Sequence, residues 1–85
     1  MKSKDDIAQD IKYLVEEVSL GATAADSIRG EDKLMADLKL DSLDYATVLL
    51  GCARLVGTNV REDGVDWSEI VTVDQLATFL ETQQS

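Results

Sequence analysis

Apolar residues recur at helical spacing in three separate stretches of this 85-residue chain, and no proline interrupts them. In the first stretch the apolar positions are Ile7, Ile11, Leu14, Val15 and Val18. Such a stripe predicts an amphipathic helix that buries one face. Ser3 is expected to cap its start, with Asp6 completing a variant of the capping box, and Gly21 is expected to end it. We assign this helix a packing role and no chemistry.

A second helix is predicted from Ser42 to Val56, because Asp41 and Ser42 are both good N-cap residues and Gly57 is a good C-cap. Its apolar residues form two rows, Leu49, Cys52 and Val56 in one and Leu43, Ala46, Leu50 and Ala53 in the other. Two rows cover more of a helix than core packing alone usually needs. The second row is therefore expected to face a partner; the alternative is that it packs under the preceding loop.

The last helix is predicted to begin at Thr72, which can form a capping box with Gln75. Its buried stripe is Val73, Leu76, Ala77 and Leu80, widened by Phe79. A short helix is expected before it, near Asp66 to Ile70, with Trp67 as its anchor. The sequence therefore predicts one all-α domain over residues 1–85, a small four-helix bundle of three main helices plus a short third helix.

A long first loop should join the first two helices, because turn formers dominate between Ala22 and Asp41. Four apolar residues are expected to pin this loop to the core, namely Ile28, Leu34, Met35 and Leu38. One turn of helix around Asp32 to Met35 would fit the same pattern. Loops of this length are often functional in compact domains.

The chain is strongly acidic, with 17 acidic and 8 basic residues and a net charge of −9. Such a surface repels nucleic acid and anionic membranes, and it favours a protein partner with a basic surface, although solubility alone would explain it equally well. The N-terminus lacks the apolar core of a signal peptide, and no run is long enough to span a bilayer. We expect a cytoplasmic monomer.

Catalytic and metal chemistry find little support in the composition. The chain has no histidine and one cysteine, Cys52, which excludes a histidine-based triad, an internal disulfide and the usual zinc sites. The acidic run around Gly64 lacks the alternating ligands of a calcium loop, so no metal site is predicted. Cys52 is expected to be a small buried hydrophobe, and the neighbouring Gly51 and Ala53 allow either close helix approach or a cavity. The chain lacks the parts of an autonomous enzyme.

A serine stands where the long loop turns into the second helix, within the run from Asp37 to Tyr45. The ordinary interpretation of Ser42 is a helix cap. The same position offers unpaired backbone N–H groups and the positive end of the helix dipole, which suit a serine that carries a phosphodiester. Tyr45 is expected to be a packing or surface aromatic.

These residues resemble the carrier-protein family, whose acyl, peptidyl and aminoacyl members hold cargo as a thioester on a 4'-phosphopantetheine arm. The family pattern is roughly Asp-Leu-Gly-x-Asp-Ser-Leu followed by an amphipathic helix. The matching residues are Asp37, Leu38, Asp41, Ser42, Leu43 and Asp44. The resemblance implies that a separate phosphopantetheinyl transferase attaches the arm, taken from coenzyme A, to Ser42, with Asp41 and Leu43 beside the attachment point.

The resemblance also implies a surface on which partner enzymes dock. The residues expected to form it are Asp41, Leu43, Asp44, Ala46, Thr47, Leu50, Arg54, Glu62, Asp63 and Asp66. Further negative charge nearby comes from Glu31, Asp32 and Asp37. The expected partners are the transferase, an acyltransferase or an adenylating (loading) enzyme, and synthase enzymes with basic or apolar docking surfaces.

Three departures from the family pattern refine this interpretation. Lys39 replaces the usual glycine, and the segment before the last helix is slightly long. The second helix carries Thr47, Ala53 and Arg54 where carriers of fatty-acid synthesis are rich in glutamate. The sequence therefore favours a stand-alone carrier of polyketide, antibiotic or other specialised biosynthesis. The alternatives are an aminoacyl carrier of the D-alanyl type, suggested by Asp66 and Trp67, and a non-carrier acidic helical adaptor in which Ser42 is only a cap.

Overall fold

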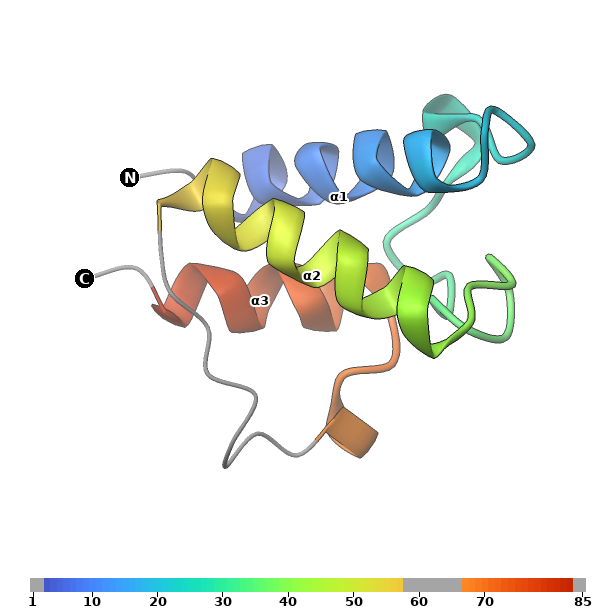
Figure 1. Ribbon diagram of the computed structural model, residues 1–85. Coiled ribbons are helices and arrows are strands. Elements are labelled where there is room, and N and C mark those ends of the chain that lie inside the picture. Colours follow the sequence, from blue (N-terminus) through green and yellow to red (C-terminus); the bar gives the residue numbers. More distant parts are fainter. Residues whose placement is uncertain (1–2, 58–66, 84–85) are drawn as a thin grey trace.

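The computed structural model describes residues 3–57 and 67–83 (Figure 1). Three α-helices make up most of this part: α1 (Lys4–Val18), α2 (Ser42–Val56) and α3 (Val73–Gln83). Two short 3₁₀ turns, η1 (Ala25–Ser27) and η2 (Trp67–Glu69), lie in the connections. The described ranges contain no β-strand, only an isolated bridge between Lys33 and Thr72. The predicted all-α fold is confirmed, and the predicted short third helix is the 3₁₀ turn η2.

α1 begins and ends as the sequence predicts. The Ser3 hydroxyl accepts a 3.2 Å hydrogen bond from the Asp6 backbone N–H and so caps the helix. Ile7, Ile11 and Val15 are fully buried, and Leu14 and Val18 pack against the same core. After the helix, Gly21 adopts a φ of 83°, and its N–H reaches back to the Glu16 carbonyl at 2.9 Å.

α2 buries a different set of residues from the predicted row. The buried residues are Val48, Leu49, Cys52 and Ala53. Ala53 therefore belongs to the core face, not to the outward row, and Val48 fills a core position that neither row contained. Gly51 sits where α2 comes close to α1, since a Cβ there would lie 2.9 Å from Leu14 Cδ1. The predicted stop at Gly57 is confirmed by its φ of 80°.

α3 starts with the predicted capping box. The Gln75 N–H donates to the Thr72 hydroxyl at 3.1 Å, and the Thr72 N–H donates to Gln75 Oε1 at 3.0 Å. The Val71 N–H donates to the same Oε1 at 2.8 Å. The predicted stripe of Val73, Leu76, Ala77 and Leu80 is fully buried.

The helices are arranged so that one end of the molecule gathers the starts of α2 and α3. Figure 1 shows α1 running opposite to both of them, with the long first loop at that same end. α1 packs against both α2 and α3, whereas α2 and α3 make fewer contacts with each other. The space between the starts of α2 and α3 is therefore left to the first loop and to the segment before α3.

The long first loop is pinned to the core by Ile28, Leu34 and Leu38, as predicted. Met35 was expected to join them, but half of its surface is exposed because Leu34 takes the core position and Met35 is directed away from it.

The turn considered around Asp32 to Met35 forms one residue later and does not extend into a helix: the Asp37 N–H donates to the Lys33 carbonyl at 2.9 Å. At Asp32 and Leu34 the backbone bonds instead to the segment that leads into α3. The Leu34 N–H donates to the Val71 carbonyl at 2.8 Å, and the Val73 N–H donates to the Asp32 carbonyl at 3.1 Å. These bonds use the groups that a local helical turn would need.

Candidate functional site

The N-terminus of α2 is capped by Asp41 and not by Ser42. Asp41 Oδ1 accepts a 2.7 Å hydrogen bond from the backbone N–H of Asp44, while the Asp41 backbone itself is extended. Ser42 is consequently the first residue of the helix, and it is exposed. The two sequence-based N-cap candidates therefore have different positions, and only Asp41 performs the capping.

The Ser42 hydroxyl has no hydrogen-bond partner within the described ranges, 3–57 and 67–83. Other serines of the chain use theirs locally. Ser3 caps α1, Ser19 donates to the Glu16 carbonyl at 3.1 Å, and Ser27 donates to the Ala24 carbonyl at 2.7 Å. Ser42 thus presents an exposed hydroxyl at the positive end of a helix dipole, with no local bond to break before it can react.

The loop that leads to Ser42 is held by Asp37, whose carboxylate accepts a 2.8 Å hydrogen bond from the Lys33 N–H. Lys39 follows with a φ of 58°, in the left-handed region that a glycine adopts at little cost. This is the position at which the carrier-family pattern has glycine. The turn that precedes Ser42 is therefore present, although a lysine makes it.

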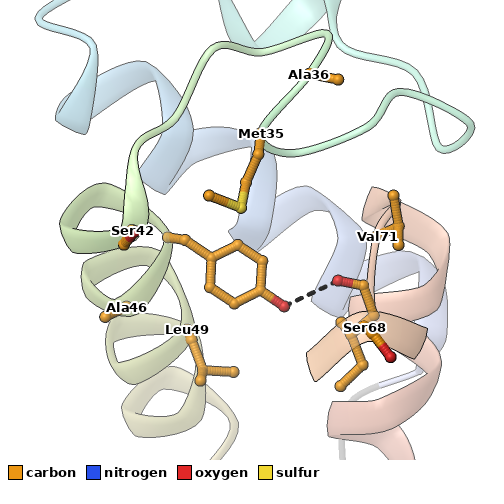
Figure 2. A pocket seen from close by; sticks show the side chains of 9 residues that line it. Met35, Ala36, Ser42, Ala46, Leu49, Ser68 and Val71 are labelled. Atoms are coloured by element: carbon orange, nitrogen blue, oxygen red, sulfur yellow. Dashed lines mark hydrogen bonds between the residues drawn. The ribbon is translucent and has the colours of Figure 1, made fainter. Parts of the chain in front are cut away.

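A cavity of about 510 Å³ lies directly beside Ser42. Three walls line it: Met35 and Ala36 from the first loop; Ser42, Tyr45, Ala46 and Leu49 from α2; and Ser68, Ile70 and Val71 from the segment before α3. Figure 2 shows Met35 extending from the loop into the space between α2 and the segment that carries Ser68 and Val71. Cys52 does not line this cavity: it is fully buried in the core, and the neighbouring Gly51 brings α2 close to α1, as the packing alternative expected.

Tyr45 is a site residue that the sequence alone did not single out. Its hydroxyl donates a 3.1 Å hydrogen bond to the Ile70 carbonyl, the dashed line in Figure 2. The next carbonyl, that of Val71, accepts the Leu34 N–H. Hydrogen bonds to two consecutive carbonyls therefore hold the segment before α3 against α2 and against the first loop. The signal that could have found Tyr45 is its place three residues after Ser42, on the same helix face.

Burial raises the pKa of the Tyr45 phenol from 10.0 to about 12. The cause is desolvation, which disfavours the charged phenolate. Tyr45 is therefore neutral at any physiological pH, and it acts at the cavity as a hydrogen-bond donor with an apolar ring.

The outer surface of α2 presents a line of side chains that we call the docking stripe: Leu43, Thr47, Leu50 and Arg54. All four are exposed, with 75% of Leu43 and 48% of Leu50 accessible. The alternative in which Leu43 and Leu50 pack under the preceding loop is therefore wrong. The predicted docking residue Ala46 instead lines the cavity.

Acidic groups lie at the start of this stripe, where Asp41 is exposed and Asp44 partly buried. Among the other predicted acids, Asp32 accepts a 2.8 Å hydrogen bond from the Arg29 N–H, and Glu31 lies 3.8 Å from the Arg29 guanidinium. The predicted docking residues Glu62, Asp63 and Asp66 lie outside the described residues, as does the side chain of the predicted anchor, Trp67.

Comparison with known proteins does not assign the chain. No protein-family model matches it, and a search of curated proteins finds no match. In the part of the chain that the structure describes, no helix has the length and apolar character needed to cross a membrane. The same part contains no group of acidic or cysteine side chains that could hold a metal ion. The geometry around Ser42 is thus the basis for any functional assignment.

Proposed function

We propose that this protein is a carrier that holds an acyl cargo on a 4'-phosphopantetheine arm attached to Ser42. The observation that supports this most is the Ser42 hydroxyl itself, which is exposed, has no bonding partner in the described residues and opens beside an apolar cavity. Asp41 supplies the helix cap, so modification of Ser42 leaves the cap of α2 intact. The arm fits this site, because the hydroxyl accepts a phosphodiester without displacing any bond of the fold.

Ser42 requires a separate enzyme for its modification. The residues that line the cavity beside it include no histidine, lysine or carboxylate that could act as a base, and an unactivated serine hydroxyl is a poor nucleophile. A phosphopantetheinyl transferase would supply that base to take the Ser42 proton, while the Ser42 oxygen bonds to the phosphorus next to pantetheine, the diphosphate bond of coenzyme A breaks and adenosine 3',5'-bisphosphate leaves. Once attached, the arm provides a terminal thiol that holds cargo as a thioester. The start of α2 favours the negative phosphodiester by about 0.3–1 kcal/mol through its dipole.

The docking stripe suits brief contacts with partner enzymes. Leu43 and Leu50 offer an apolar contact, and Arg54 offers a positive charge at the far end. Exposed charge pairs contribute about 1 kcal/mol or less, which allows the carrier to leave one partner for the next. The tether then keeps the cargo at high effective concentration near the partner's active site.

The same stripe favours polyketide or other specialised biosynthesis over housekeeping fatty-acid synthesis. After Asp44, α2 has no acidic residue, and its exposed positions carry Thr47 and Arg54 instead. A partner that binds carriers through a line of glutamates on this helix would have no such carboxylates to contact here. We therefore expect a loading enzyme and synthase partners whose docking surfaces are largely apolar, in the cytoplasm.

The two alternatives have less support. The adaptor hypothesis explained Ser42 as a helix cap, and Asp41 performs that role. The aminoacyl-carrier hypothesis drew on Asp66 and Trp67, and neither side chain lies among the described residues. Cargo chemistry is better judged from the cavity than from that segment.

Intact-mass spectrometry tests the proposal. The chain is incubated with coenzyme A and a broad-specificity phosphopantetheinyl transferase, beside Ser42→Ala and Ser27→Ala as the matched pair. The proposal predicts one pantetheine adduct on the unchanged chain and on Ser27→Ala, and none on Ser42→Ala. An unmodified chain after reaction with several transferases would favour the adaptor.

A further inference from the structure

We propose that Tyr45 selects the cargo of this carrier, by limiting the cavity beside Ser42 to a short, uncharged acyl chain. This inference rests on the carrier function proposed above. It concerns which thioesters the protein shelters from solvent, a property that the attachment of the arm does not itself determine.

The Tyr45 side chain spans the cavity from one wall to the other. Its backbone belongs to α2, and its hydroxyl lies 3.1 Å from the carbonyl of Ile70 on the opposite wall. Ser42 and Tyr45 are three residues apart, so both side chains rise from the same face of the helix. The Tyr45 ring therefore lies one helical turn from Ser42, in the path of an acyl chain that enters the cavity when the arm folds back onto the protein.

The opposite wall is fixed and holds the ring in place. Ile70 is buried, and the neighbouring Val71 carbonyl accepts the 2.8 Å bond from the Leu34 N–H. Moving Ile70 away from Tyr45 would thus also disturb the first loop. A ring bonded to such a wall acts as a fixed barrier to the chain.

Two further residues of α2 line the same cavity as Tyr45. Leu49 lies one further turn along α2 and also lines the cavity, and Ala46 between them has a small side chain. Figure 2 shows Leu49 beyond Ala46 on the same helix, below the loop residue Met35. Shortening the Tyr45 side chain would enlarge the cavity towards Leu49 and admit a longer chain.

The lining also decides the charge of the cargo. Among the described residues that form the cavity, none is an aspartate, glutamate, lysine or arginine. The α-ammonium of an aminoacyl group would lose water there and gain no carboxylate, which is costly. An uncharged acyl chain has no charge to desolvate, and burial of its CH₂ groups is favoured by the hydrophobic effect.

Thioester lifetime measures the selection directly. A transferase attaches to Ser42 an arm that already carries a butyryl, decanoyl or alanyl thioester, taken from the corresponding coenzyme A thioester with release of adenosine 3',5'-bisphosphate. Loss of each group to hydroxylamine is then followed by intact mass, relative to the same thioester of free pantetheine. We expect butyryl to react about tenfold more slowly on the protein, equivalent to about 1.4 kcal/mol of protection. Decanoyl and alanyl should react at close to the rate of the free thioesters.

Three variants isolate Tyr45. Tyr45→Ala and Tyr45→Leu should extend protection to decanoyl, and Tyr45→Phe, which keeps the ring, should retain the preference for butyryl. Leu55→Ala is the control, because Leu55 is exposed on α2, lies outside the docking stripe and does not line the cavity. Circular dichroism of each variant confirms that the helices are present, and Tyr45→Leu keeps an apolar side chain in case Tyr45→Ala fails to fold.

The outcomes separate the two proposals. Three results would overturn the role of Tyr45 while leaving the carrier function in place. The first is equal protection of butyryl and decanoyl in the unchanged chain, and the second is protection of alanyl equal to that of butyryl. The third is an unaltered protection profile in the folded Tyr45→Leu or Tyr45→Ala variant. Failure to attach any arm to Ser42 would overturn both.

Discussion

Asp41 Oδ1 accepts a 2.7 Å hydrogen bond from the backbone N–H of Asp44, and this bond caps α2 one residue before Ser42. A capping serine would have its hydroxyl occupied by the backbone, and a bulky group on that oxygen would disturb the helix start. The arrangement here separates the two roles. Asp41 stabilises the helix, and the Ser42 side chain is left exposed.

Asp41→Ala should lower the free energy of unfolding by about 1 kcal/mol, because the first turn of α2 loses its cap. Urea denaturation measures this effect. Asp41→Asn is the matched control, since an asparagine side chain can accept the same hydrogen bond and should retain most of the stability. Equal losses in the two variants would show that the carboxylate charge matters more than the cap.

Lys39→Gly should raise the free energy of unfolding by about 0.5–1 kcal/mol, because Lys39 has a φ of 58° that strains a residue with a side chain. Lys33→Gly is the control, because Lys33 is an exposed lysine of the same loop without a positive φ. The free energy of unfolding of this variant should fall. The two variants can be compared by thermal or urea denaturation. A loss of stability in Lys39→Gly would show that the turn before Ser42 is not strained.

Stability should fall as the pH rises from 10 to about 12, because burial raises the pKa of Tyr45 from 10.0 to about 12. In that range the unfolded chain releases the phenol proton while the folded chain retains it, so the contribution of Tyr45 is complete below pH 10 and is lost through pH 12. Tyrosinate absorbance during a pH titration detects this late ionisation. It should disappear in Tyr45→Phe and persist in Tyr13→Phe. A late ionisation that survives in Tyr45→Phe would assign it to another group.

Arg54→Glu should slow processing by the native loading enzyme by about fivefold, as expected for one exposed ionic contact. Arm attachment at Ser42 should stay nearly unchanged, because Arg54 lies in the last turn of α2, at the opposite end from Ser42. Arg29→Glu, which changes an exposed arginine of the first loop by the same charge, is the control. Unchanged kinetics with the loading enzyme in Arg54→Glu would remove Arg54 from the docking stripe.

Local sequence signals predicted the helices well, since their determinants lie within a few residues of one another. The Ser3 cap, the Thr72–Gln75 capping box and the stripe that begins at Ile7 all form as expected. The position of Ser42 at a helix start followed from the same kind of signal. The local signal did not show whether Asp41 or Ser42 makes the cap, because aspartate and serine accept the capping hydrogen bond equally well.

The spacing of apolar residues could not predict contacts between segments that are far apart in the sequence. Tyr45 bonds to the carbonyl of Ile70, 25 residues away, and helical spacing gives only the face on which Tyr45 stands. Met35 likewise matched a core pattern, but pairing of its neighbour Leu34 with Val71 turned it away from the core. The cavity arises from these long-range bonds, so the sequence could indicate a serine at a helix start without showing the space beside it.

Peptide-level mass spectrometry of the chain after reaction with coenzyme A and a phosphopantetheinyl transferase examines the attachment point most directly. We predict one adduct, on the peptide that contains Ser42, with the peptides that contain Ser3, Ser19 and Ser27 unmodified. An adduct on any other serine, or a chain that no transferase modifies, would contradict the carrier function.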